Sequence, residues 1–242
     1  MRPPSPRLRL VKSAPQGAID PPPASRRGAQ AALADLGDDQ LVALAAGGDN
    51  RAAEQLYRRH APFALNLATR IAGSSHDVED VVHDAFLRAF DNLGSLRNTK
   101  AFKSWLGSIV VHAMRSRLRR GRLMRVLGLG RGTEPVDLDC VASESASPRA
   151  KAELAQVYAL LQTLSADDRI AWTLRYVEGH DLKEAATLAD CSLATVKRRI
   201  RRAQKYIEEH FVSAADDAGP ASDRRPLSEA FDDRDHEEGA VS

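Results

Sequence analysis

The sequence contains few aromatic residues, few cysteines and no long apolar run. Phenylalanine, tryptophan and tyrosine make up 5% of the 242 residues, which suits small helical domains better than a β-sandwich. Cys140 and Cys191 are the only cysteines, and neither lies in a CxxC motif. The sequence therefore predicts neither a disulfide framework nor a zinc site, and it favours a reducing compartment.

Apolar runs are also too short to cross a membrane. The longest of them, such as the run from Leu41 to Ala46, fall far short of the roughly 20 residues that a bilayer requires. The basic N-terminus has no apolar core of the kind that a secretory signal needs, and proline is frequent there. We therefore expect no membrane insertion and a cytoplasmic location.

Motifs of the common enzyme classes are missing as well. The histidines are scattered without HExxH spacing, and the chain contains no GxxxxGK[ST] and no GxGxxG loop. The sequence therefore predicts no catalytic residue, no metal site and no cofactor.

Charge is distributed unevenly along the chain, although the formal net charge is only +2. Residues 1–34 carry six basic side chains against one acidic one, and residues 213–242 carry nine acidic side chains against three arginines. We predict a disordered, basic, proline-rich arm over 1–35 and a disordered acidic tail over 213–242. One hypothesis is that the tail folds back on a basic DNA-binding face, and the alternative is a tail that only increases solubility.

Between the two ends, apolar residues recur with the helical period in two blocks. The predicted fold is all-α, with small helical domains over 36–120 and 149–212 that are joined by a flexible linker. The linker, over 121–148, is marked by glycines and prolines. No segment shows a convincing strand alternation.

The first block has four predicted helices. Asp38 is expected to cap a helix that ends at Ala46, and a second helix runs from about 49 to 72, with a kink or break at Pro62. A third helix follows Ser75 and ends near 92, and a fourth begins after Thr99 and runs into an arginine cluster.

The end of the second block predicts a helix-turn-helix. Ser165 with Asp168, and Asp181 with Glu184, have capping-box spacing, so each pair is expected to open a helix. Asp190 can supply the left-handed residue of the turn, and Ser192 is expected to cap the last helix. That helix turns Leu193, Val196, Ile200, Ala203 and Ile207 inward and exposes a basic face suited to a DNA major groove: Thr195, Lys197, Arg198, Arg199, Arg201, Arg202 and Lys205.

Two further helices carry charge of opposite sign. Arginines at 115, 117, 119, 120, 122 and 125 follow a helix that contains Phe102, Lys103 and Trp105, and cations beside aromatic rings suit single-stranded nucleic acid. The alternative is that both aromatic rings are core residues. The third helix instead groups Asp77, Glu79, Asp80, Asp84 and Asp91, which suggests a basic protein partner or simply a solvated acidic face.

The order of these features resembles bacterial sigma factors of the sigma-70 family, in the short form of the extracytoplasmic function (ECF) subfamily. The stretch 77–90 (DVEDVVHDAFLRAF) is similar to region 2.2, which docks on core RNA polymerase. The stretch 102–109 (FKSWLGSI), followed by LRR at 118–120, resembles the helix that melts and reads the minus-10 element. Residues 164–203, with EAA at 184–186 and TVKRR at 195–199, look like region 4.2, which reads the minus-35 element.

The resemblance implies a role for each set of residues, and an anti-sigma factor is a further candidate partner beside core RNA polymerase and promoter DNA. Polymerase binding is implied for Asp77, Glu79, Asp80, Val81, Asp84 and Phe86. Minus-10 contacts are implied for Ser95, Arg97, Asn98, Lys103, Trp105, His112, Arg115, Arg119 and Arg120, with a flipped-out base held by the loop 95–98. Minus-35 contacts are implied for Ser192, Thr195, Lys197, Arg198, Arg201 and Arg202.

The chain also departs from the family's pattern. His112 and Ser116 stand where Asn and Asp are common, and Ala189-Asp190 replaces the common Leu-Gly of the turn. An alternative interpretation is a helix-turn-helix regulator that acts on duplex DNA without being a polymerase subunit. The acidic third helix beside an arginine-rich fourth helix favours the sigma-factor interpretation.

Overall fold

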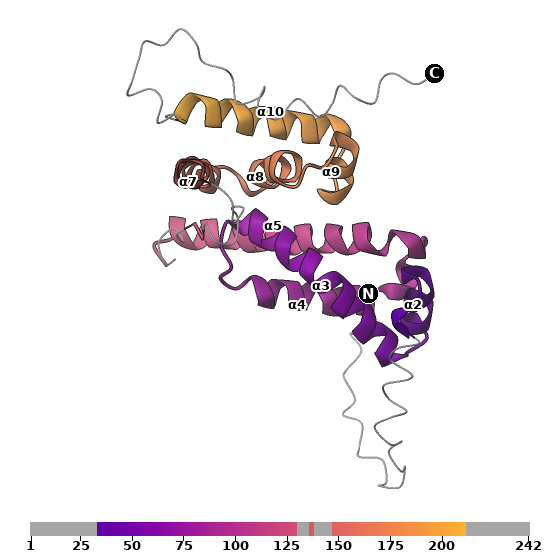
Figure 1. The fold of residues 1–242 in the computed structure, drawn as a ribbon. Helices are drawn as coiled ribbons and strands as arrows, with labels where there is room; N and C mark the ends of the chain where they lie inside the picture. The colour runs from indigo at the N-terminus through magenta and orange to yellow at the C-terminus, as the bar shows by residue number, and fades with distance from the viewer. Residues whose placement is uncertain (1–32, 130–135, 138–146, 212–242) are drawn as a thin grey trace, which may run out of the picture. The chain divides into compact units, whose positions relative to one another are not determined.

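The computed structural model describes residues 33–129, 136–137 and 147–211, and within these ranges the regular structure is helical (Figure 1). The all-α prediction is therefore confirmed. The predicted acidic tail, and the predicted basic arm up to residue 32, lie outside the described residues.

The first block contains four α-helices and two short 3-10 turns. Asp49 caps one helix by accepting a hydrogen bond from the Arg51 amide, and that helix ends at Gly73, whose φ of 66° is left-handed. Both ends agree with the prediction, because a carboxylate accepts well from a free amide and glycine adopts positive φ at little cost. The elements are α2 (Asp38–Ala46), α3 (Asn50–Ala72), α4 (Val78–Asp91), η1 (Leu93–Ser95), η2 (Thr99–Ala101) and α5 (Phe102–Val126).

Two details of these helices differ from the prediction. Gly37, not Asp38, is the capping residue of α2, because the Asp38 carboxylate instead accepts from Arg59 at 2.7 Å and pairs with His60 at 2.9 Å. Helix α3 is continuous through Pro62, so the predicted break is absent, while a kink there stays a prediction. Proline removes one backbone hydrogen bond, and the buried neighbours Ala61 and Ala64 hold the two halves of the helix against the core.

Helix α5 extends beyond the predicted end of the first block. It continues through Gly121 to Val126, into the segment predicted as linker, and ends before Gly128, whose φ is 69°. Proline is absent from the sequence between α5's first residue and Pro135. An exposed glycine costs a helix only about 1 kcal/mol, so the good helix formers around Gly121 keep the helix intact.

The core of the first block lies between α3, α4 and α5. Leu56, Phe86, Phe102 and Leu106 are all 1% exposed or less. The Phe86 ring lies 4.6 Å from the Tyr57 ring, and the Phe102 ring lies 5.1 Å from the His60 ring, measured between centroids. This packing fixes which faces of α4 and α5 remain available to partners.

The second block begins with a capped helix and ends with the helix-turn-helix. Ser147, Ser165 and Ser192 each accept a hydrogen bond from the amide three residues on, and Asp181 with Glu184 forms the predicted capping box. The elements are α7 (Pro148–Thr163), α8 (Ala166–Trp172), a π-helical turn η3 (Thr173–Val177), α9 (Leu182–Leu188) and α10 (Leu193–His210).

The turn between α9 and α10 has the expected left-handed residue, since Asp190 has a φ of 47°. Val196, Ile200, Ala203 and Ile207 are buried as predicted. The inward position expected for Leu193 is wrong: this first residue of α10 is 40% exposed.

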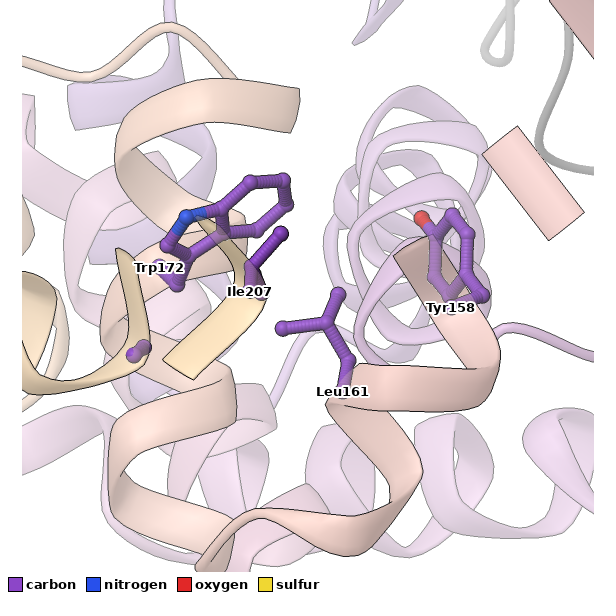
Figure 2. Packing of buried hydrophobic residues seen from close by; sticks show 5 residues of the cluster. Tyr158, Leu161, Trp172 and Ile207 are labelled. Carbon is purple, nitrogen blue, oxygen red and sulfur yellow. The ribbon is translucent and has the colours of Figure 1, made fainter. Parts of the chain in front are cut away.

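Helices α7, α8 and α10 enclose the second core (Figure 2). Its buried members are Tyr158, Leu161, Trp172, Ala203 and Ile207. The Trp172 indole N–H donates to Gln204 Oε1 at 2.7 Å, so the polar atom of this large ring is satisfied.

Part of the segment between the blocks is described, and it contacts both of them. The Asp137 amide donates to the Gly73 carbonyl at 2.9 Å, and Ser75 Oγ donates to Asp137 Oδ2 at 3.0 Å. Val136, its neighbour, packs against the second core. Helix α5 in turn contacts α8 and α9, so the two helical blocks touch directly.

Candidate nucleic-acid and protein interfaces

Helix α10 presents basic side chains on the face opposite its buried stripe. Lys197, Arg198 and Arg201 are exposed, while Thr195 is half-buried and its hydroxyl lies 2.8 Å from that of Ser192. The Ser192 hydroxyl also caps the helix, so it has a structural task in addition to any contact with DNA. The exposed cations lie along a helix that can enter a major groove.

Arg202 differs from its neighbours because it already has a carboxylate partner. Its Nε donates to Asp168 Oδ2 at 2.8 Å, and its Nη2 donates to Asp168 Oδ1. The Asp168 side chain is 6% exposed and that of Arg202 is 59% exposed. The hydrogen bond and charge of Asp168 raise the pKa of Arg202, so the guanidinium is firmly cationic. The sequence identified Arg202 only as a DNA contact, and the structure gives it a second role between α8 and α10.

The predicted minus-10 residues on α5 fall into an exposed set and a set that is engaged within the chain. Lys103, His112 and Arg120 are exposed, and Lys103 Nζ lies 4.8 Å from the Phe63 ring centroid. Trp105 is half-buried, with its ring 6.1 Å from that of the fully buried Phe102. Part of the indole is therefore free to meet a base, while Phe102 belongs to the core.

The loop that leads into α5 is held by its own polar side chains. Ser95 Oγ donates to the Asn92 carbonyl at 2.7 Å, and Asn98 Oδ1 accepts from the Lys100 amide at 3.2 Å. Arg97, between them, is exposed. The loop therefore has a defined conformation that can present a shaped surface to an unstacked base.

The acidic side chains of α4 lie on its outer face. Glu79, Asp80 and Asp84 are exposed and Val81 is half-buried. Asp77, with a φ of 55°, precedes the helix, and its carboxylate lies 3.3 Å from the Arg117 guanidinium. Phe86 is 1% exposed and packs against Tyr57, so its ring supports this face from the core and is not available for a partner.

Asp167, which the sequence did not single out, brings three arginines together. Its carboxylate pairs with Arg115 Nε at 2.9 Å, Arg119 Nη2 at 2.6 Å and Arg199 Nη2 at 3.4 Å. Burial alone would raise the pKa of Asp167, but the hydrogen bond from Arg119 and the charges of Arg199 and Arg115 lower it overall. These partners lie on α5 and α10, far from Asp167 in the sequence, so no local pattern could have revealed the cluster.

Neither a metal site nor a membrane span was found in the part of the chain that the structure describes. Groups of three or more His, Cys, Asp or Glu side chains that could hold a metal ion are absent from these residues. Among the described helices, none combines the length and the apolar character needed to span a bilayer.

Comparison with known proteins gives two family matches and several relatives. Sigma-70 region 2 matches residues 56–123, and Sigma-70 region 4 matches residues 154–207. The RNA polymerase sigma-H factor of Pseudomonas aeruginosa is 31% identical over 189 residues, which cover 71% of this chain and 92% of the relative. The ECF RNA polymerase sigma-E factor of Escherichia coli is 32% identical over 187 residues, which cover 72% and 93% respectively.

A solved structure shares the fold. The sigma factor RpoE in complex with the anti-sigma factor NepR from Bartonella quintana matches with a TM-score of 0.50 and 24% identity, over 64% of this chain and 94% of that one. The order of the helices, the two matched regions and the identity to these relatives agree with one another. The chain therefore belongs to the sigma-70 family as an ECF-type sigma factor, a transcription initiation factor that directs RNA polymerase to promoters.

Proposed function

We propose that this cytoplasmic sigma factor divides its task among three helices. The acidic face of α4 binds core RNA polymerase, and the loop 95–98 with α5 melts and holds the minus-10 element. Helix α10 reads the minus-35 element in the major groove. The protein itself performs no chemistry, and the polymerase makes the RNA.

The observation that carries this proposal is the contrast between the acidic outer face of α4 and the basic exposed face of α10. Asp80 and Asp84 on α4 would repel DNA, and they suit a basic protein surface. Lys197 and Arg198 on α10 suit phosphates and base edges. Arg120 on α5 lines the same hollow as Asp80 and Asp84, so it offers a cation next to the acidic face. A regulator that acted on DNA alone would have no use for the acidic face or for a helix suited to single strands.

The proposed minus-10 surface has the two components that single-stranded DNA requires. Trp105 offers part of a ring for stacking, which is worth about 1–3 kcal/mol per base. Arg120 and Lys103 offer exposed charge for the backbone. Flipping a base out costs a few kcal/mol, so one stacked base with a backbone contact is enough to offset that cost.

The proposed minus-35 surface uses the first turns of α10. Lys197, Arg198 and Arg201 lie on the exposed face, where a bidentate contact with a guanine edge discriminates by about 1–3 kcal/mol. Ser192 and Thr195 lie near the helix N-terminus, whose positive end would favour a phosphate. The minus-10 and minus-35 surfaces can each bind DNA modestly, because binding at one raises the effective concentration of DNA at the other when both are held on one polymerase.

An anti-sigma factor is the third partner that we propose. The end of α5 and the residues just after it expose apolar side chains that a partner can cover: Leu123 is 57%, Val126 78% and Leu129 70% exposed. Apolar groups gathered in this way beside arginines suit a partner with apolar and acidic side chains.

The test is run-off transcription with core polymerase, this protein and a broad promoter library. We expect promoter-specific transcripts that depend on the added chain. The double variant D80R/D84R should lose core binding in gel filtration, because it reverses the charge of the proposed docking face. The matched control E54R, on an exposed position of α3, should keep it. Sequence-specific duplex binding without any core binding would support the regulator interpretation instead.

A further inference from the structure

The last turns of helix α5 carry a surface that combines apolar side chains with arginines. Arg119, Arg122, Leu123 and Val126 follow one another at the spacing of a single helix face, and all four line a hollow of about 370 Å³ beside the first residues of α8. Leu123 is 57% and Val126 78% exposed, so the hollow is open to solvent. We call these four residues the α5 end face.

Exposed apolar side chains gather at this end of α5. In the part of the chain that the structure describes, nine large apolar side chains are exposed, and five of them lie within residues 123–129. Single apolar residues on a surface are ordinary, whereas a group of them marks a place that a further segment or molecule covers.

The charge around the α5 end face is positive. Arg122 is exposed, and the Arg119 side chain is 62% exposed. The one acid that lines the hollow, Asp167, is shared among Arg119, Arg115 and Arg199. Because four arginines surround one carboxylate, an occupant with acidic as well as apolar side chains fits this face.

Two neighbouring basic surfaces fit such an occupant less well. The other side of the same turns of α5 lines a hollow that also contains Asp80 and Asp84, which would repel an acidic segment. On the described residues of α10, Lys197 and Arg198 are exposed, but Leu193 is the only exposed large apolar side chain. Of these three surfaces, the α5 end face alone offers apolar area and an excess of positive charge together.

The chain itself contains a segment of matching composition, beyond the described residues. Residues 227–238 carry six acidic side chains against one arginine. Leu227 and Phe231 are the only large apolar residues between Val212 and Val241. The segment therefore offers two apolar groups among acids, which is the composition that the α5 end face suits.

The segment is also close enough along the chain to reach this face. Arg119 on α5 and Arg199 on α10 both contact the Asp167 carboxylate, so the α5 end face lies beside the middle of α10. Phe211 follows Arg199 by twelve residues, which is about 18 Å of helix. Leu227 follows Phe211 by sixteen residues, which span at most about 55 Å.

Taking the proposed function as its basis, we propose that residues 227–238 dock on the α5 end face of their own chain. The two apolar residues of the segment cover Leu123 and Val126, and its acidic residues pair with Arg119 and Arg122. Arg119 belongs to the proposed minus-10 surface, and Leu123 and Val126 belong to the proposed anti-sigma surface. The segment therefore competes with single-stranded DNA and with an anti-sigma factor for the same end of α5.

The expected size of this competition follows from the covalent attachment. A tethered segment has an effective concentration in the millimolar range at its own target. A dissociation constant of about 1 mM is therefore enough to keep the face covered half of the time or more. A ligand that needs the free face gains about two- to threefold in affinity when the segment is disabled.

The direct test is photo-crosslinking from position 231 in the full chain. With Phe231 replaced by p-benzoylphenylalanine, irradiation of the monomer followed by proteolysis and mass spectrometry should link position 231 to residues 119–126. The variant L123S/V126S should lose this link, because it removes the apolar contact from two exposed positions. The matched control L44S, which changes an exposed leucine of α2, should keep it.

A binding assay measures the competition with single-stranded DNA. The probe is a fluorescein-labelled oligothymidylate, which reports backbone and stacking contacts without a promoter sequence, and the measurement is fluorescence anisotropy. The full-chain variant D232N/D233N should bind it about two- to threefold more tightly than the natural chain. The matched control D216N/D217N removes the same charge from an earlier part of the tail and should keep the natural affinity.

A further variant removes the apolar groups without changing charge. L227A/F231A should show the same two- to threefold gain as the acidic variant, because both disable the same segment. All of these changes except L123S/V126S and L44S lie outside the helical blocks, and circular dichroism of those two variants checks that their helices are kept.

Several outcomes overturn the docking of the tail. They are a link from position 231 to α10, a link to a second copy of the chain, no link at all, or an equal gain in affinity for D216N/D217N and D232N/D233N, which would reduce the effect to net charge. Run-off transcription separates this result from the proposed function. If the natural chain directs promoter-specific transcription while position 231 links elsewhere, only the docking of the tail fails.

Discussion

Replacing Arg202 by alanine should destabilise the protein as well as weaken its binding to minus-35 DNA. Arg202 is the bidentate partner of Asp168, whose side chain is 6% exposed, whereas Arg201 beside it is exposed on the same helix. R202A leaves the Asp168 carboxylate without its main partner in a buried position. R201A removes a cation of the same kind and makes the matched control.

The size of the effect follows from the burial of the two partners. An acceptor left unsatisfied in a buried site costs about 1–3 kcal/mol. Because the Arg202 side chain is 59% exposed, water can reach the vacated position, so we expect the lower half of that range. In a chain of this size, about 1.5 kcal/mol lowers the melting temperature by about 3–6 °C.

The measurements are thermal unfolding by circular dichroism and binding to a duplex that contains the minus-35 element. R202A should lower both the melting temperature and the affinity, whereas R201A should lower only the affinity. Equal melting temperatures for the two variants would refute the reasoning, because they would show that the Asp168 pair contributes nothing to stability. D168N provides the reciprocal check and should lower the melting temperature by a similar amount.

Three further predictions concern the core, two glycines and pH. I207A should lower the free energy of unfolding by about 2–5 kcal/mol in urea titrations, because Ile207 is fully buried in the second core and its removal leaves a cavity. G73A should destabilise the protein by about 1–2 kcal/mol, since Gly73 has a φ of 66° and an added Cβ would meet Tyr158. G121A should instead stabilise it by about 0.5–1 kcal/mol in the same titration, because Gly121 lies in a helix with no atom near the added Cβ. Burial lowers the pKa of His60 more than the Asp38 carboxylate raises it, with Arg59 and Lys103 also lowering it. As the pH falls, the unfolded chain therefore takes up a proton on His60 before the folded chain does. The contribution of His60 to the free energy of unfolding is fully present above about pH 6.5 and is lost below it. H60Q should flatten that part of a stability-against-pH curve.

Features that depend on neighbours in the sequence could be predicted well. Asp181 and Ser192 cap the helices that the sequence indicated, because a cap needs only its own side chain and an amide two or three residues away. The left-handed turn at Asp190 follows from equally local geometry. The helical pattern also placed the charged faces of α4 and α10, which carry the proposed function.

Features that depend on distant partners could not be predicted. Asp168 has the spacing of a capping-box acid, but its carboxylate is used by Arg202, more than thirty residues away. Asp38 was expected to cap α2, and it is drawn instead to Arg59 and His60 on α3. Phe86 lay among acidic residues in a sequence stretch resembling a polymerase-binding region, and packing against Tyr57 places it in the core. In each case a tertiary contact overrides a local preference.

The attachment of Asp137 to the first block sets how far apart the two blocks can move. Helix α5 ends at Val126 and α7 is capped by Ser147, so the connection between them spans at most about 70 Å when fully extended. With Asp137 still bonded to Gly73 and Ser75, the covalent reach from Asp137 to Ser147 is at most about 35 Å. The attachment of Asp137 therefore limits the reach of the connection, and its release would about double the distance over which one sigma factor can contact two separate promoter elements.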